Sequence, residues 1–198
     1  MIRNDESRKA SDALRLMLRP AAEYSARVAA SLDAKWAEAI SVPLLLALLL
    51  GIVTSVATTG RVVASLLLSQ TVCWSFVPAL QLGTGSLLIA SAPRRRVTFP
   101  RAVELLFAAH GPWSLWLVAT GVLQSVFPDQ NLALASSLIP WTWTAWMLTA
   151  YGREILALTP AQSRLRVLAH QGAAVLLILT YMELGSRLSV RLIGVFQG

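Results

Sequence analysis

The chain has 198 residues, of which 56% are hydrophobic and only 14% are charged, and its mean hydropathy is +0.61. A soluble domain has about 25% charged residues. The composition therefore excludes an ordinary soluble protein and predicts an all-α polytopic membrane protein, with interfacial amphipathic helices beside its spans. The net charge is +7, from 17 basic and 10 acidic residues. Because the basic residues gather beside apolar segments, we expect contacts with membrane lipids and no binding of nucleic acid.

The cysteine count and the residue usage bear on the compartment. Cys73 is the only cysteine, which excludes an intrachain disulfide and argues against a cysteine-based metal site within one chain. The first apolar run starts near residue 39, too far along for a cleavable signal peptide, so we expect the first span to direct insertion. Arginine far outnumbers lysine, and alanine and leucine abound. This usage suggests a GC-rich bacterial genome and hence the bacterial inner membrane.

The first 38 residues are predicted to form a cytoplasmic segment. Residues 1–10 are charged, and residues 11–38 carry apolar side chains at helical spacing, with basic side chains off that stripe. Pro20 cannot continue a helical ladder, so a helix should break there and restart with Pro20 or Ala21 in its first turn. The amphipathic helix is expected to lie in the interface, to dock on a partner, or to pack on its own spans.

Two apolar runs, 40–59 and 62–92, should form an antiparallel hairpin because only Gly60 and Arg61 separate them. Each run carries a stripe of small residues, which permits close approach of two helices. Counted outward from the turn, one stripe falls opposite the other; the alternative is that the stripes bind a helix of a partner. The residues predicted to pack are Ala47, Gly51, Ser55, Ser75, Ala79 and Gly83.

The second run is too long for one straight span. Residues 62–92 would extend about 46 Å at 1.5 Å per residue, whereas the hydrocarbon core is about 30 Å thick. Pro78 or the Gly83/Gly85 pair should therefore kink it, or its end should emerge into the cytoplasm.

A basic hinge, residues 93–110, follows. Arg94, Arg95, Arg96 and Arg101 are predicted to contact anionic lipid headgroups or the acidic surface of a partner. Thr98 is a predicted N-cap with Pro100 in the first turn. The predicted helix is interfacial and not a span. Its apolar face, opposite Arg101 and Glu104, consists of Phe99, Ala102, Val103, Leu106 and Phe107.

Three more spans, at about 111–127, 132–151 and 167–182, complete a predicted five-span domain over residues 39–185. The fourth contains Trp141, Trp143 and Trp146 in its middle third, where they should fill gaps between helices or line a lipid groove. Thr159 and Gln162 form a capping box at the start of the fifth helix. The tail, 186–198, is amphipathic and should lie along the far interface.

Basic residues alternate between the two sides of these five spans. The successive segments outside the spans contain seven, one, four, none, three and two basic residues. The positive-inside rule therefore predicts a cytoplasmic N-terminus and a periplasmic C-terminus.

Few residues point to a particular chemistry. The sequence has no Gly-rich phosphate loop, metal-binding helix motif or nucleophile motif, so we predict that the protein is not an enzyme and has no cofactor or metal. His110 and His170 should both lie near the inner interface, where a shared metal or proton site is one hypothesis. Gln70, Gln81 and Gln124 are expected to join helices by hydrogen bonds.

The order of segments resembles that of the Yip family, five-span membrane proteins named as Rab-GTPase interactors. The resemblance rests on Arg19-Pro20 before an amphipathic helix, the span PLLLALLLG, and the segment VTFPRA in a helix that ends at a Gly-Pro, and it covers about residues 14–185. It implies a bacterial relative with a cytoplasmic N-terminus. The Asp-Leu-Tyr-Gly-Pro signature of the eukaryotic members is absent, so the resemblance assigns Rab binding to no residue here.

The small-residue stripes, the amphipathic flanking helices and the lack of a catalytic set favour one function. We predict a non-enzymatic integral membrane subunit or scaffold that packs with other membrane proteins, or with itself, in a larger complex. The alternative, suggested by the kinked second run and the deep tryptophans, is a transporter or a lipid-translocating protein.

Overall fold

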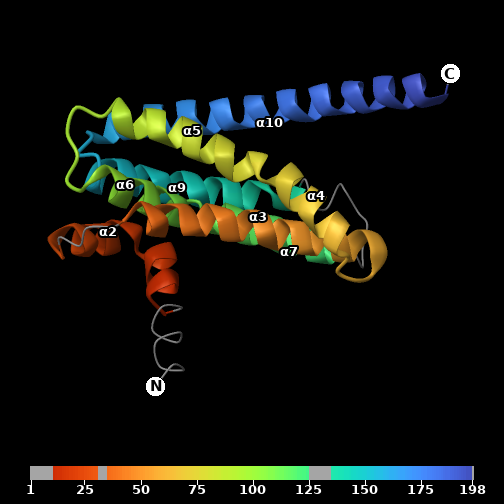
Figure 1. Ribbon diagram of the computed structural model, residues 1–198. Helices are drawn as coiled ribbons and strands as arrows, with labels where there is room; N and C mark the ends of the chain where they lie inside the picture. The colour runs from red at the N-terminus through yellow and green to blue at the C-terminus, as the bar shows by residue number, and fades with distance from the viewer. Residues whose placement is uncertain (1–10, 31–34, 125–134, 198) are drawn as a thin grey trace.

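The computed structural model describes residues 11–30, 35–124 and 135–197, with the backbone alone for residues 124, 182 and 185–197. The predicted segment 1–10 and the second turn, 128–131, lie outside the described residues. All regular structure in the described ranges is helical, which confirms the all-α class. The helices are the segment 11–18, α2 (Pro20–Ala29), α3 (Trp36–Thr59), α4 (Ala64–Trp74), α5 (Phe76–Ala90), α6 (Phe99–Ala109), α7 (Gly111–Gln124), α9 (Leu138–Glu154) and α10 (Pro160–Gln197) (Figure 1).

Two described helices are long and apolar enough to span a membrane: α3, and the run Ala64–Ala90 made of α4 and α5. A third results if α6 and α7, bent by 48° at their junction, form one broken span. The described residues are therefore consistent with a membrane protein of two or three spans, and the count of five stays a prediction.

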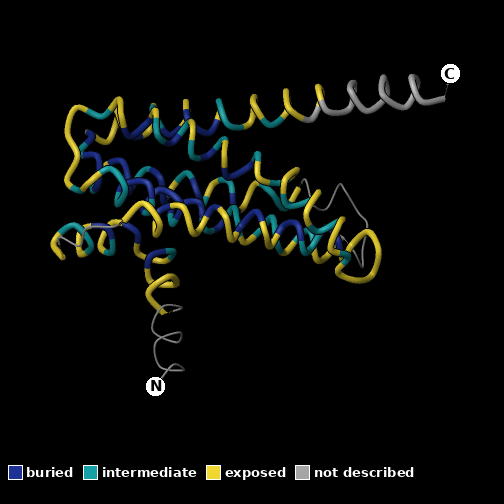
Figure 2. Tube along the Cα trace, viewed as in Figure 1, coloured by how far each residue is buried: buried dark blue, intermediate teal, exposed yellow. Residues whose placement is uncertain are grey.

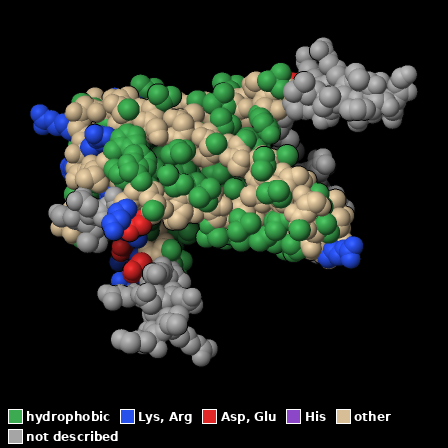
Figure 3. Space-filling model, in the orientation of Figure 1, with side chains coloured by type: hydrophobic (Ala, Val, Ile, Leu, Met, Phe, Trp, Pro, Cys, Tyr) green, Lys and Arg blue, Asp and Glu red, His purple; other side chains and the backbone are tan. Residues whose placement is uncertain are grey.

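The surface is compatible with a lipid environment. Apolar side chains cover the visible face of the bundle (Figure 3), and exposed leucines lie on most of the long helices. A soluble protein rarely exposes so continuous an apolar surface. Examples, all more than half exposed, are Leu44, Leu68, Leu87, Leu115 and Leu176.

The predicted hairpin of α3 and α4 forms, with Gly51 at the closest approach. A Cβ atom added at Gly51 would lie 2.9 Å from the backbone nitrogen of Thr71 and 3.0 Å from its Cα. Ala47 and Ser55 are also buried. Ser55 Oγ accepts a hydrogen bond from the Val63 backbone N–H at 3.2 Å, which ties the ends of the hairpin together next to its turn. The predicted stripe residues of the first run, Ala47, Gly51 and Ser55, therefore pack within the chain.

The predicted stripe residues of the second run do not pack within the chain. Ser75, Ala79 and Gly83 are exposed, and an added Cβ at Gly83 would meet nothing within 4 Å. The reason is that the helix breaks at Ser75, three residues before Pro78. Helix α5 then diverges from α3, which it still contacts, and packs mainly on α10 and α6 (Figure 1). Proline lacks the N–H that would bond to the residue four before it. The close contact beyond the break is made by Gly85, against the side chain of Leu106.

Helix α6 lies inside the bundle, which differs from the interfacial position predicted for it. It packs on α3, α5 and α9, and Figure 2 shows buried residues concentrated in this part of the molecule. Thr98 occupies the predicted N-cap position, although its side chain forms no capping hydrogen bond. Two features allow enclosure: Leu105 and Ala109 widen the apolar face, and Arg101 forms an ion pair with Glu104, so neither charge is buried alone.

The N-terminal helices dock across the end of α9. The predicted break is confirmed, since α2 begins at Pro20 after Arg19. The hydroxyl of Tyr24 donates to the backbone oxygen of Leu105 at 3.4 Å, and burial raises the pKa of this phenol, which keeps it protonated as a donor. Ser25 Oγ donates to Glu154 at 2.9 Å. The described residues 11–30 therefore pack on the chain's own helices, one of the alternatives predicted for this segment.

Helix α10 begins at the predicted capping box. The Thr159 backbone N–H donates to Gln162 Oε1 at 3.2 Å, and the Gln162 N–H donates to Thr159 Oγ1 at 3.3 Å. The helix continues to Gln197, and its far half extends away from the bundle (Figure 1). Residues 186–197 of the predicted tail continue the helix of the preceding segment without a break.

Candidate functional site: a buried histidine pair

The structure brings His110 and His170 together inside the bundle. His110 follows the last residue of α6, where the chain bends into α7, and His170 lies on α10. Their Nε2 atoms are 3.2 Å apart, and each side chain is about 5% exposed. His170 is ten residues after the start of α10, or about 15 Å along the helix axis, so the pair lies well inside the bundle.

The hydrogen bonds of the pair define its tautomers. His110 Nδ1 is 2.9 Å from the backbone oxygen of Leu106. A carbonyl oxygen only accepts, so His110 Nδ1 carries a proton and donates it. In the neutral ring the other nitrogen, Nε2, is then an acceptor. His170 must therefore donate its Nε2–H to His110, which leaves Nδ1 of neutral His170 unprotonated.

The pair lines a cavity of about 50 Å³ between α5, α7, α9 and α10. Apolar and aromatic side chains form most of its wall. Further polar side chains, each at most 6% exposed, come from Gln81 on α5, Thr144 on α9 and Gln171 on α10. The remaining lining residues are Val77, Leu80, Trp113, Trp141, Ala174, Val175 and Ile178.

Several polar atoms of this lining have no hydrogen-bond partner among the described residues. They are Gln81 Oε1, Thr144 Oγ1, Gln171 Oε1 and His170 Nδ1. The other end of the Gln171 amide is held, since its Nε2 donates to the Trp141 carbonyl at 3.4 Å. An unpaired buried polar group costs about 1–3 kcal/mol. Such atoms are expected at a site that receives a ligand or ordered water.

The free atoms define what the cavity can bind. Two are amide oxygens and the fourth is an unprotonated ring nitrogen, which only accept, whereas the Thr144 hydroxyl can accept or donate. The cavity therefore offers mainly acceptors to a species that donates hydrogen bonds. Its volume suits a proton, a few waters or a solute of similar size, since one water needs about 10–15 Å³. The described residues contain no group of three or more His, Cys, Asp or Glu side chains placed to hold a metal ion.

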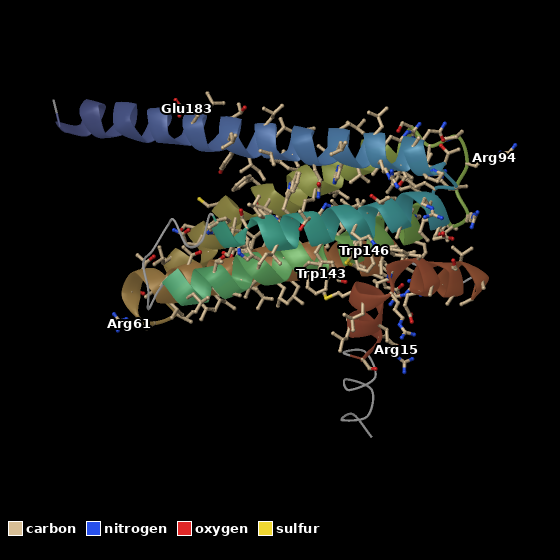
Figure 4. All side chains as sticks on the ribbon, turned by 180° about the vertical axis from the view of Figure 1, so that it is seen from behind. Arg15, Arg61, Arg94, Trp143, Trp146 and Glu183 are labelled. Atoms are coloured by element: carbon tan, nitrogen blue, oxygen red, sulfur yellow. The ribbon has the colours of Figure 1, made fainter. Side chains whose placement is uncertain are left out.

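The hinge arginines lie at one end of the bundle, away from this cavity. Figure 4 shows Arg94 projecting from that end, opposite Arg61 at the other. The Arg95 guanidinium lies 5.3 Å from the ring centre of Phe99. Arg96 is 3.7 Å from Glu154, and Arg101 is paired with Glu104 and largely buried. Arg94 and Arg95 are therefore the hinge residues with cationic groups left for an anionic partner.

The three tryptophans of α9 have three different surroundings. Trp141 lines the histidine cavity, and Trp143 Nε1 donates to the backbone oxygen of Met17 at 3.0 Å. Trp146 is half exposed. The sequence reading singled out both histidines and Gln81, but missed Thr144 and Gln171. The adjacent polar pair His170–Gln171 within an apolar run was the available signal for Gln171.

No protein-family model matches the chain, and no curated protein or solved structure is significantly similar to it. Fold and site together define the class: an all-helical protein with two or three helices able to span a membrane and a mostly apolar cavity between its helices that contains a histidine pair. The resemblance to the Yip family stays a prediction.

Proposed function

We propose that this chain is a membrane transporter that moves a proton or a small hydrogen-bond-donating solute, with the cavity around His110 and His170 as its binding site. The hydrogen bond between two buried imidazoles carries the proposal. Ionisable side chains within a membrane-embedded bundle are costly, and they characteristically mark ion and proton pathways. Transport is the alternative that the sequence suggests beside the favoured subunit or scaffold, and the pairing of the histidines supports it as the leading proposal.

Two hydrogen-bonded imidazoles suit the transfer of one proton at a time. An added proton binds the free Nδ1 of His170, and the cation so formed keeps its hydrogen bond to His110. A second proton would place two positive charges side by side in a buried site, which like-charge repulsion and desolvation oppose. The polar oxygens of Gln81, Thr144 and Gln171 surround the pair with acceptors for the species that brings the proton.

Flux through reconstituted liposomes tests this proposal. With a pH-sensitive dye inside the vesicles, the wild-type chain should dissipate an imposed pH gradient, or take up methylammonium, faster than empty vesicles. His170→Ala should reduce the rate about 100-fold or more, the range in which positioned proton-transfer groups act. Gln81→Leu should also reduce it, because this change removes an acceptor from the cavity wall.

Gln70→Leu supplies the matched control, since Gln70 lies on α4 and does not line the cavity. Its rate should equal that of the wild-type chain. The proposal would be overturned if the wild-type chain moved neither protons nor methylammonium faster than empty vesicles do. It would also be overturned if Gln81→Leu and Gln70→Leu slowed the flux equally.

The second candidate is the membrane subunit or scaffold that the sequence favoured. It is supported by the exposed small residues Ser75, Ala79 and Gly83, which repeat every four residues from the break before α5 along the outside of α5. Small residues at this spacing let a second helix approach closely. On this reading the stripe packs against another membrane protein or a second copy of the chain.

Copurification in mild detergent, followed by blue-native electrophoresis, tests the second candidate. Ala79→Leu should release the companion or the second copy, because leucine keeps the two backbones apart. Ser69→Leu is the control, since Ser69 is exposed on α4 but lies off the stripe. A wild-type chain that migrates as a monomer without companions would rule this function out.

A further inference from the structure

Three arginines converge on one groove at the end of α9. Arg19 precedes α2, Arg153 lies in the last turn of α9 and Arg164 lies in the first turns of α10. All three are exposed, and all three line a groove of about 650 Å³. None of the residues that line this groove is acidic.

The fold builds this convergence through close contacts. An added Cβ at Gly152 would lie 3.2 Å from the Cβ of Ser163, and Ser163 Oγ donates to the Thr149 backbone oxygen at 2.8 Å. This crossing of α9 and α10 brings the next residue of each helix, Arg153 and Arg164, to the same surface. The docking of α2 through buried Pro20 then adds Arg19.

The charges in this groove are not neutralised by other described side chains. Elsewhere at this end of the bundle arginines have partners: Arg96 faces Glu154, Arg101 pairs with Glu104, and Arg166 donates to Ser91 Oγ at 3.2 Å. No described side chain forms an ion pair or hydrogen bond with the guanidinium of Arg19, Arg153 or Arg164. Three like charges gathered without a counter-charge favour an anion.

An apolar track leads away from the arginines along α9. Trp146 lines the basic groove and also a neighbouring groove of about 490 Å³ lined by Leu18, Ile139 and Trp143. In Figure 4, Trp146 lies nearer than Trp143 to the end of the bundle that carries Arg94. From Arg153 to Ile139 the helix rises about 21 Å, enough to cross one leaflet of a hydrocarbon core about 30 Å thick.

We propose that the arginine groove and the track beside it bind an anionic phospholipid. The phosphate of the headgroup contacts Arg19, Arg153 and Arg164, whose planar guanidiniums suit phosphate oxygens. An acyl chain lies along Trp146, Trp143 and Ile139. The apolar track selects a lipid over a soluble phosphate, because a soluble anion would use the arginines and leave the track exposed. This site is separate from the hinge arginines and from the histidine cavity.

Native mass spectrometry of the full chain, titrated with phosphatidylglycerol and with phosphatidylcholine, tests the site. The wild-type chain should bind phosphatidylglycerol more tightly. A basic residue near a membrane surface contributes about fivefold to the affinity for anionic lipid, so Arg153→Gln with Arg164→Gln should weaken binding of phosphatidylglycerol about 25-fold. The matched control, Arg15→Gln with Arg61→Gln, removes the same charge outside the groove and should change binding less than about threefold.

Two further measurements separate the possible ligands. Phosphatidylglycerol with brominated acyl chains should quench the fluorescence of Trp146, which is identified as the part of the emission that Trp146→Phe removes. The double variant, Arg153→Gln with Arg164→Gln, should lose this quenching. Saturating inorganic phosphate should not displace the lipid. Three results would overturn the proposal. Equal losses of affinity in the groove and control variants would show attraction by overall charge, and displacement of the lipid by phosphate would show a soluble-anion site. Equal affinity for phosphatidylcholine and phosphatidylglycerol would show no headgroup recognition.

Discussion

Gly51→Ala should destabilise the protein by about 1–2 kcal/mol. The new methyl group would meet the Thr71 backbone nitrogen at 2.9 Å and its Cα at 3.0 Å, and a backbone cannot rotate away as a side chain can. Overpacking of this kind costs about 1–3 kcal/mol. The better helix propensity of alanine over glycine returns about 0.5–1 kcal/mol. Thermal unfolding of the detergent-solubilised chain measures the net effect.

Gly83→Ala is the matched control and should have the opposite sign. Nothing lies within 4 Å of a Cβ atom added there, so the propensity gain of about 0.5–1 kcal/mol acts alone. The opposite result, a destabilised Gly83→Ala variant and a stable Gly51→Ala variant, would mean that the chain packs through Gly83 and not through Gly51. The register described for α3 and α4 would then be wrong.

Removal of either histidine should cost about 1–3 kcal/mol, because each substitution leaves the other imidazole buried without its hydrogen-bond partner. The double variant, His110→Ala with His170→Ala, should cost less than the sum of the two single variants by about 1 kcal/mol. Such a double-mutant cycle isolates the interaction between the rings. Additive losses would show that the two rings do not interact.

Nitrogen NMR of the chain labelled at histidine provides an independent test of the same pair. The chain has only two histidines, so the spectrum contains two rings. His110 should be protonated at Nδ1, because that nitrogen donates to the Leu106 carbonyl, and His170 at Nε2. Each single variant assigns the remaining ring. Two rings protonated at the same nitrogen would contradict the geometry.

Local signals along the chain were enough for several parts of the fold. Pro20 marks the start of α2 because proline is poorly tolerated in the interior of a helix. Thr159 and Gln162 cap each other across three residues, so they mark the start of α10 wherever that helix packs. The hairpin of α3 and α4 follows from its short turn. Each of these features depends on residues close in sequence.

The position of α6 in the bundle depends on contacts between residues that are far apart in the sequence. An amphipathic segment such as 99–109 can lie on a membrane or inside a protein, because both environments cover one apolar face. The structure resolves this through Tyr24 and Tyr151, whose hydroxyl groups donate to the backbone of α6 from α2 and α9. Residues so far apart in sequence leave no periodic signal. The exposure of Gly83 likewise follows from the direction that α5 takes after Ser75.

By itself, then, the sequence determined the all-helical class with helices apolar enough to span a membrane, the breaks and caps of several helices, and the two histidines as residues of interest. Composition, proline and capping residues act locally, which is why these features could be predicted. Only the tertiary structure decided that His110 and His170, which are 60 positions apart, meet, and that Arg19, Arg153 and Arg164 share one groove. The physical reason is that helix crossings, such as that of Gly152 on Ser163, place side chains in contact. A crossing depends on the shapes of two helices together, which neither segment specifies alone.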